Sequence, residues 1–284
     1  MAHFNLHFFK EKVRKIEVDS LFSFFDDIPG FDMESDDESV RFTYHNKNLN
    51  YQARFIITKK SMVPNIYRLN PKYLDVNFHL ELPILLVDYA AKQVFEIARE
   101  LSEQFNLFVY NELFEDVIPF KMAYVMKAFT DVKDIYIERN PLIISDYYMQ
   151  PKNKLSDIYR YTDDSYDLQK YYHGLKTHVP YYVFLKDDTK YLKIAIEWLE
   201  NTLTVFPPYL DYIIVKSEKE TKIIDYIEFY EVCGKYLSDV PGFIKGSKVL
   251  QQKQAKKVYK VIRKHKFTKI PHTFKTVHMR YLLD

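Results

Sequence analysis

The residues of this sequence best suited to chemistry are the cations of residues 241–284. This segment holds twelve lysine and arginine residues and a single acid, Asp284, so its formal charge is +11. Residues 1–240 hold the other 29 bases and 38 of the 39 acids, which gives them a formal charge of −9. Lysine and arginine clustered in this way attract phosphates and other anions. The segment is therefore the first candidate for a binding site.

Residues 247–266 are expected to form one amphipathic helix, because they contain no glycine or proline and Ser247 is placed to cap it. At about 100° per residue, the apolar and basic side chains fall on separate sides. The apolar residues are Leu250, Ala255, Val258, Val261 and Ile262. The candidate nucleic-acid-binding residues are Lys253, Lys256, Lys257, Lys260, Arg263, Lys264, Lys266 and Lys269. We expect the apolar side to dock on the protein body and the cations to face a partner.

A helix face of one sign favours an anionic partner, because like charges four residues apart repel one another. Nucleic acid is the leading partner. RNA is slightly preferred over DNA, because aromatic rings that interleave with the bases can stack on unpaired nucleobases. Those ring-bearing residues are His265, Phe267, His272, Phe274 and His278. Three alternatives stay open: the acidic body neutralises the segment, the face is plain solvated surface, or it meets anionic lipid. The apolar side is modest for a membrane-surface helix.

Candidate catalytic residues are sparse. Asp211, Glu220 and Lys222 are of the types that hold Mg²⁺ and position water in a nuclease, although such a pattern is frequent by chance. His173 and His178 flank Gly174 near three aspartates, without the close spacing of a zinc site. The aspartates are Asp163, Asp164 and Asp167. Cys233 and Trp198 fall on apolar stripes and are expected in the core.

Glycine is scarce, and this disfavours several classes of enzyme. The chain has five glycines, and neither GxGxxG nor GxxxxGK[ST] occurs. Phosphate-cradling loops need closely spaced glycines, because the backbone must turn sharply against the ligand. A Rossmann dinucleotide site, a P-loop nucleotidase and a protein kinase are therefore disfavoured, and no GxSxG motif indicates a serine hydrolase. We expect no cofactor, no metal and no enzymatic activity, and the sequence carries no motif typical of a known family.

The elements that must position these residues follow from hydrophobic periodicity. The expected strands are 4–9, 40–44, 51–58, 73–82, 107–110, 181–185 and 210–215. The expected helices are 19–25, 84–105, 120–129, 189–203 and 221–237, besides 247–266. Residues 32–38 are expected to be an acidic loop, and residues 146–179 a connecting region with partial helix.

These elements predict an α+β protein with mixed or antiparallel sheets and helices packed on one face. The predicted divisions are 1–145, an N-terminal α+β subdomain; 146–179, the connecting region; 180–240, a second α/β subdomain; and 241–284, the basic C-terminal helix and tail. Strand–helix–strand–helix order at 73–130 and 181–237 raises the hypothesis of a duplication. A chain ending at residue 241 is expected to stay folded and lose binding.

Composition indicates that the protein is globular and suggests the compartment in which it occurs. Hydrophobic residues make up 47% of the chain and aromatic residues 17%, with 25 tyrosines, enough to build a core. Neither a membrane-spanning run nor a secretory leader is expected. The lone Cys233 suits a reducing compartment, so a cytoplasmic protein is expected. The leading hypothesis is a non-enzymatic nucleic-acid-binding or ribonucleoprotein-associated protein. The alternative is a protein–protein adaptor whose basic tail docks on an acidic partner, and the third is a divalent-metal nuclease.

Overall fold

The computed structural model of the protein describes residues 2–15, 17–173, 177–187, 191–199, 202–218, 220–240, 244–270 and 273–284. It is an α+β protein, as the sequence predicts. The chain forms two units: one comprises Met1–Tyr147 with Leu283–Asp284, and the other comprises Tyr148–Leu282. The predicted cation site lies in the second unit.

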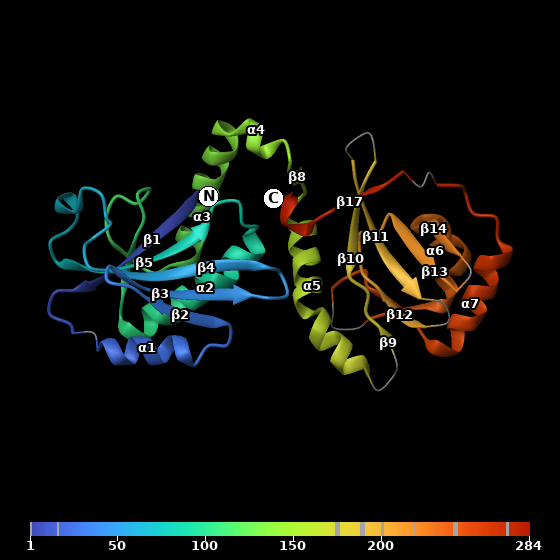
Figure 1. Ribbon diagram of the computed structural model, residues 1–284, viewed down its shortest axis with the longest axis horizontal. Coiled ribbons are helices and arrows are strands. Elements are labelled where there is room, and N and C mark those ends of the chain that lie inside the picture. Colours follow the sequence, from blue (N-terminus) through green and yellow to red (C-terminus); the bar gives the residue numbers. More distant parts are fainter. Residues whose placement is uncertain are drawn as a thin grey trace. The chain divides into compact units, whose positions relative to one another are not determined.

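A seven-stranded antiparallel sheet is the frame of the first unit (Figure 1). Its strand order is β2-β3-β4-β5-β1-β6-β7. The elements of this unit are β1 (His3–Glu11), α1 (Val18–Asp26), β2 (Phe31–Ser35), β3 (Ser39–Asn46), β4 (Tyr51–Thr58), the 3₁₀ helix η1 (Ile66–Arg68), β5 (Tyr73–Pro83), α2 (Asp88–Phe105), β6 (Phe108–Tyr110), β7 (Ile118–Pro119), α3 (Met122–Arg139) and α4 (Pro141–Ile144). The strands form where apolar and polar residues alternate, because successive side chains of a strand point to opposite faces.

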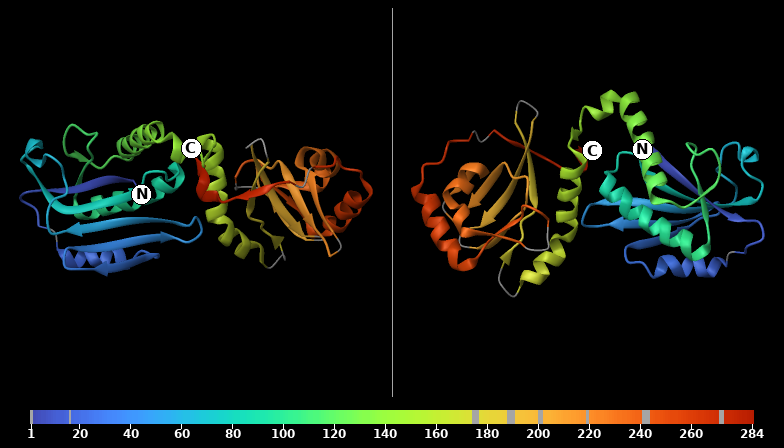
Figure 2. Two further views of the ribbon diagram at one scale, coloured as in Figure 1. Left: turned by 45° about the horizontal axis from the view of Figure 1, so that its top comes forward. Right: turned by 180° about the vertical axis from the view of Figure 1, so that it is seen from behind.

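Helices α1, α2 and α3 pack on one face of this sheet (Figure 2). Phe25 of α1 stacks on Phe42 of β3, with ring centroids 4.3 Å apart. Phe4 of β1 meets Phe95 of α2 and Phe129 of α3 edge to face, at 5.8 and 5.6 Å. Such aromatic pairs stabilise a core beyond the area that they bury.

A buried ion cluster joins α2 and α3 to the C-terminal residues of this unit. The Lys133 ammonium of α3 lies 2.5 Å from Asp88 Oδ1 and 2.8 Å from Asp284 Oδ1. The Lys133 side chain is fully buried, and that of Asp284 is 2% exposed. The Asp284 carboxylate also accepts the backbone N–H of Asp88, at the start of α2. A buried charge of this kind is tolerated only because it is paired and hydrogen-bonded.

Two sheets and three helices organise the described part of the second unit. The five-stranded sheet has the order β14-β13-β11-β10-β17, and the four-stranded sheet has the order β15-β16-β12-β9. The elements are β8 (Tyr148–Met149), α5 (Lys152–Tyr172), β9 (Thr177–His178), β10 (Tyr182–Lys186), β11 (Leu192–Leu199), β12 (Leu203–Phe206), β13 (Tyr212–Lys216), β14 (Thr221–Asp225), α6 (Tyr226–Cys233), η3 (Gly234–Tyr236), β15 (Leu237–Asp239), β16 (Lys248–Leu250), α7 (Gln252–Lys264), β17 (Lys275–Val277), η4 (Met279–Tyr281) and β18 (Leu282–Leu283), whose second residue belongs to the first unit.

The helix predicted over residues 189–203 is wrong, because strands β11 and β12 occupy most of that range. Ile194, Ala195 and Ile196 are all buried, so both faces of β11 are covered. A strand covered on both faces reads as a continuous apolar run, which periodicity cannot distinguish from a buried helix. The second half of the chain therefore does not repeat the strand–helix–strand–helix order expected of a duplication.

Two further expectations are corrected. Residues 221–237 were expected to be one helix, but β14 precedes a shorter α6, whose first turn Asp225 caps by accepting the N–H groups of Ile227 and Glu228. The acidic stretch at 32–38 contains β2, an edge strand whose acids face solvent while its backbone pairs with β3. The partial helix expected within residues 146–179 is the 21-residue helix α5.

The basic segment 241–284 contributes one strand to each of the two sheets of the second unit. β16 lies between β15 and β12, and β17 pairs with β10. Helix α7 begins at Gln252, not Ser247, because residues 248–250 pair as a strand, and its N-cap is Gln251. Removing the segment would take a strand from each sheet, so the truncated chain is not expected to stay folded.

Candidate nucleic-acid interface

Helix α7 is held by an apolar side, as the sequence predicts. Its buried residues are Ala255, Val258, Tyr259 and Ile262. Their spacing of three and four residues places them on one side of a helix. The Tyr259 ring meets Trp198 of β11 edge to face, with centroids 6.4 Å apart. Figure 1 shows α7 beside α6 in the second unit. This packing orients the opposite side of α7 toward solvent.

The eight predicted cations form an exposed surface that we call the basic ridge. It consists of Lys253, Lys256, Lys257, Lys260, Arg263, Lys264, Lys266 and Lys269, and each of them is exposed. Among the residues of the second unit that the structure describes, no carboxylate lies within ion-pair distance of any of their charged nitrogens. The described acids of the second unit therefore do not neutralise the basic ridge.

The charges of the basic ridge oppose the stability of α7. Lys253 lies in the first turn, where the helix dipole favours acids, and that turn contains no acid. Lys253 and Lys257 stand four residues apart, as do Lys256 and Lys260, and each such like-charge pair destabilises a helix by about 0.2–0.5 kcal/mol. Only Arg263 and Lys264, in the last turn, suit the dipole. The ridge is thus not explained by helix stability.

A carboxylate of α6 positions the end of the basic ridge. Glu228 Oε2 accepts the backbone N–H of Thr268 at 3.1 Å, and Glu228 Oε1 lies 3.3 Å from His265 Nε2. The hydrogen bond from Thr268 is the main cause that lowers the pKa of Glu228 below its usual value. Glu228 therefore stays ionised and holds the segment that carries Lys266 and Lys269.

The aromatic rings of this segment are partly used inside the protein. Phe274 packs on Tyr212 of β13 with centroids 5.5 Å apart. Phe267 meets His265 edge to face at 4.6 Å, directly beyond α7. His272 lies outside the described residues. His265 and Phe267 are therefore the rings best placed to contact a base beside the basic ridge.

Two other bases of the segment have partners elsewhere. Lys248 of β16 pairs with Asp239 of β15 at 2.6 Å. The Arg280 guanidinium lies over the Tyr281 ring, 4.9 Å from its centroid. These residues stabilise local structure and stand outside the basic ridge.

The structure does not bring the nuclease candidates together. Asp211 precedes β13 and Glu220 follows its far end, with Tyr212 paired to Asp225 and Lys216 paired to Thr221. A five-residue strand separates its ends by about 16 Å, too far for two ligands of one ion. Glu220 pairs with Lys222 at 3.0 Å, and Asp211 accepts the N–H of Ile194 at 2.8 Å. Both carboxylates have structural roles.

The remaining candidates are also structural. Cys233 is fully buried, and burial raises the pKa of its thiol to about 11, which keeps it a thiol at neutral pH. Trp198 is fully buried, in a strand and not in the predicted helix. Burial lowers the pKa of His178, while His173 is exposed and Gly174 lies outside the described residues. Within the described ranges, no group of three or more metal-binding side chains converges.

Sequence reasoning missed a polar cluster on the sheet face opposite α1 and α2. His7 of β1 pairs across the ladder with His79 of β5, and their ring centroids are 5.5 Å apart. Arg54 binds Glu81 at 2.7 Å, and Glu81 lies 3.7 Å from His79. The signal was the alternation of His79 and Glu81 with apolar residues in β5. His7 and His79 are both only 5% exposed, so their imidazole rings offer no access to a substrate.

His7 gives the protein a predicted dependence of stability on pH. Burial, together with a smaller contribution from the charge of His79, lowers its pKa from 6.5 to about 4. Between these two values the unfolded chain binds a proton that the folded protein does not, so stability falls as pH falls. At about pH 5 the loss relative to neutral pH should be roughly 2 kcal/mol. Urea unfolding of the wild type and of His7→Phe, measured at both pH values, checks this.

The His7→Phe variant should lose less stability than the wild type when the pH falls from neutral to about 5. His3 and His178 also have pKa values lowered mainly by burial, and both proteins share them. The difference between the two proteins therefore isolates His7. An equal loss of stability in both would show that His7 is protonated in the folded state.

No protein-family model, no curated protein and no solved structure matches this chain. None of the described helices is long and apolar enough to span a membrane.

Proposed function

We propose that this protein binds nucleic acid through the basic ridge, with RNA slightly preferred over DNA, and acts as a non-enzymatic RNA-binding or ribonucleoprotein-associated protein. The observation that carries the proposal is a row of eight exposed cations without a carboxylate partner among the described residues. Phosphate contacts would offset the repulsion within the ridge and release counterions from the nucleic acid.

The shape of α7 suits a phosphate backbone. Thirteen residues at about 1.5 Å each make a rod of roughly 20 Å. Lys256 and Lys260 follow one another about 6 Å apart along this rod, as do Lys253 and Lys257. The exposed His265 and the half-buried Phe267 lie beyond its end, where a base of a single strand can stack. This placement supports RNA over duplex DNA.

The dependence of binding on salt tests the proposal. If about six ridge cations contact phosphates, log K should fall with log[salt] at a slope of roughly −4 on single strands and −5 on duplex DNA. Fluorescence anisotropy with labelled single-stranded RNA, single-stranded DNA and duplex DNA at about 50–200 mM salt gives the three slopes. Absence of binding at the lowest salt would contradict the proposal. The 260/280 nm absorbance ratio of the purified protein shows whether nucleic acid copurifies.

A protein–protein adaptor is the second candidate, and exposed tyrosines favour it. Tyr166, Tyr171, Tyr181 and Tyr191 of the second unit are each 67–79% exposed. Tyrosine is enriched at protein interfaces, and the basic ridge would then meet an acidic partner. A partner that stays bound after nuclease treatment would favour this function. In both cases we place the protein in the cytoplasm, a reducing compartment in which a free thiol such as that of Cys233 does not form disulfides.

A further inference from the structure

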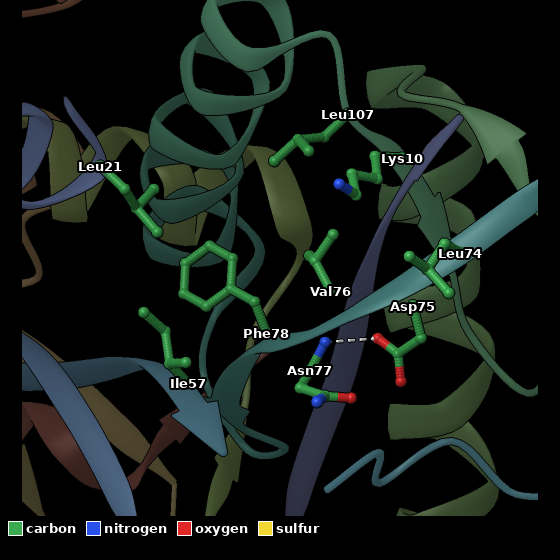
Figure 3. Close-up of a pocket in the computed structure, with 9 residues that line it drawn as sticks. All are labelled: Lys10, Leu21, Ile57, Leu74, Asp75, Val76, Asn77, Phe78 and Leu107. Carbon is green, nitrogen blue, oxygen red and sulfur yellow. Dashed lines mark hydrogen bonds between the residues drawn. The ribbon is translucent and has the colours of Figure 1, made fainter. Parts of the chain in front are cut away.

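A cavity of about 270 Å³ lies in the first unit, on the helix-covered face of the seven-stranded sheet (Figure 3). The side chains that matter here are Leu21, Ile57, Val76, Phe78, Leu107 and Lys10. They come from α1, β4, β5, β1 and the turn after α2. The volume corresponds to roughly nine water molecules at about 30 Å³ each. This is the size of a fragment-like ligand.

A bulge in β5 shapes the cavity. Phe8 of β1 pairs with Phe78, but Phe9 pairs with Asp75, so Val76 and Asn77 have no partner in β1. Asn77 has a positive φ of 55°, which an asparagine tolerates better than most residues. A bulge bends its strand and re-aims side chains, and bulges are frequent next to binding sites.

The walls of the cavity are apolar and well anchored. Leu21 and Leu107 are each 6% exposed and Phe78 is 2% exposed. The Phe78 ring also stacks on Phe8, with centroids 4.9 Å apart. Water against such walls finds few hydrogen-bond partners, so an apolar group gains free energy by displacing it. The cavity therefore selects a ligand with an apolar body.

Lys10 is the cation at the cavity, and its ammonium has spare bonding capacity. Its ammonium donates one hydrogen bond, to the Arg14 carbonyl oxygen at 2.7 Å, and an ammonium has three donors. In Figure 3 its nitrogen faces the same space as Leu107 and Val76. The Asp75 carboxylate is already engaged by the Asn77 N–H at 2.9 Å and by the Ser61 hydroxyl. The free donors of Lys10 favour an anionic head group.

We propose that this cavity binds a small aliphatic carboxylate, whose chain lies between Leu21, Val76 and Phe78 and whose carboxylate pairs with Lys10. A charge-assisted hydrogen bond at the rim would orient the ligand, and the buried chain would supply most of the affinity. This site is independent of the basic ridge, which lies in the other unit.

Octanoate is the probe for this site, and titration calorimetry measures its binding. Octan-1-ol has the same chain without charge, and octylammonium has the opposite charge, so octanoate should bind most tightly and octylammonium least. Each buried methylene contributes about a fourfold change in affinity, so hexanoate should bind roughly fifteenfold more weakly than octanoate. Absence of octanoate binding at millimolar concentration, or equal binding of all three head groups, would overturn the proposal.

Variants test separately the Lys10 ammonium and the apolar walls of the cavity. Lys10→Met keeps the stem but removes the charge, so it should weaken octanoate at least tenfold and leave octan-1-ol unchanged. Val76→Phe should fill the cavity and abolish binding of both, and Ile57→Phe does the same from β4 if the first variant does not fold. Lys47→Met is the control, since Lys47 is an exposed lysine of the same unit outside the cavity. Octanoate binding that survives both Lys10→Met and cavity filling refutes the assignment.

Discussion

The paired substitution Lys253→Glu and Lys256→Glu is expected to weaken nucleic-acid binding while making the protein more stable. Losing two of about six phosphate contacts costs roughly 25-fold in affinity for a single strand at about 0.1 M salt. The salt slope should fall from roughly −4 to −3, and the added acids repel phosphates further. Anisotropy at several salt concentrations measures both effects.

The gain in stability has a separate cause. Glutamate at position 253 places an acid in the first turn of α7, which the helix dipole favours. Glutamates at 253 and 256 also stand four residues before Lys257 and Lys260, in the favourable order for ion pairs. Together these changes should raise the free energy of unfolding by about 1 kcal/mol. Weaker binding by a more stable protein cannot be attributed to unfolding.

A matched control changes the same net charge elsewhere. Lys47→Glu with Lys60→Glu alters two exposed lysines of the first unit, in turns and not in the basic ridge. This variant should retain most of the binding. If it weakens binding as much as the ridge variant does, net charge and not the ridge governs affinity, and the proposed interface is wrong.

Lys133→Met is expected to destabilise the protein by about 3–5 kcal/mol. The substitution leaves the Asp88 and Asp284 carboxylates close together, and the Asp284 side chain is 2% exposed. Two such carboxylates repel one another and have lost the cation that compensated their burial. Urea unfolding followed by far-UV circular dichroism measures the loss, and hydrogen exchange in α2 and α3 locates it.

The other members of the cluster supply controls. Asp284→Asn leaves Lys133 paired with Asp88, so its loss should be smaller, about 1–3 kcal/mol. The double variant Lys133→Met with Asp284→Leu should recover part of the stability lost in Lys133→Met, because fewer charges stay unpaired. If Lys133→Met alone costs less than 1 kcal/mol, water must reach this cluster, and the pairing is not what stabilises it.

Local patterns in the sequence predicted much of the first unit and the basic ridge. The strands at 51–58 and 73–82 and the helix at 84–105 were recognisable from the spacing of their apolar residues, and the strand at 4–9 was recognisable as a short apolar run. The same reasoning placed the apolar side of α7 and the six exposed cations of this helix opposite it. These features depend on residues within a few turns of one another, so the amino-acid order is enough.

Other features needed partners distant in the chain. β11 is a strand with both faces buried that pairs with β10 and β13, and β16 shortens α7 because β12 and β15 pair with it. The partners of Lys133 could not be predicted for the same reason, since Asp284 follows Lys133 by 151 positions. The cavity beside Lys10 exists because β1 and β5 pair with a bulge.

The basic ridge itself was thus determined by the sequence, since charge and helical period are local properties. Its freedom from acidic partners among the described residues of the second unit was decided only by the fold. The body carries 38 acids along residues 1–240, and nothing in their order shows whether one of them reaches α7. In the folded protein Glu228 accepts a hydrogen bond from Thr268 and Glu220 pairs with Lys222. Neither carboxylate pairs with a ridge cation, so the ridge cations are exposed to solvent.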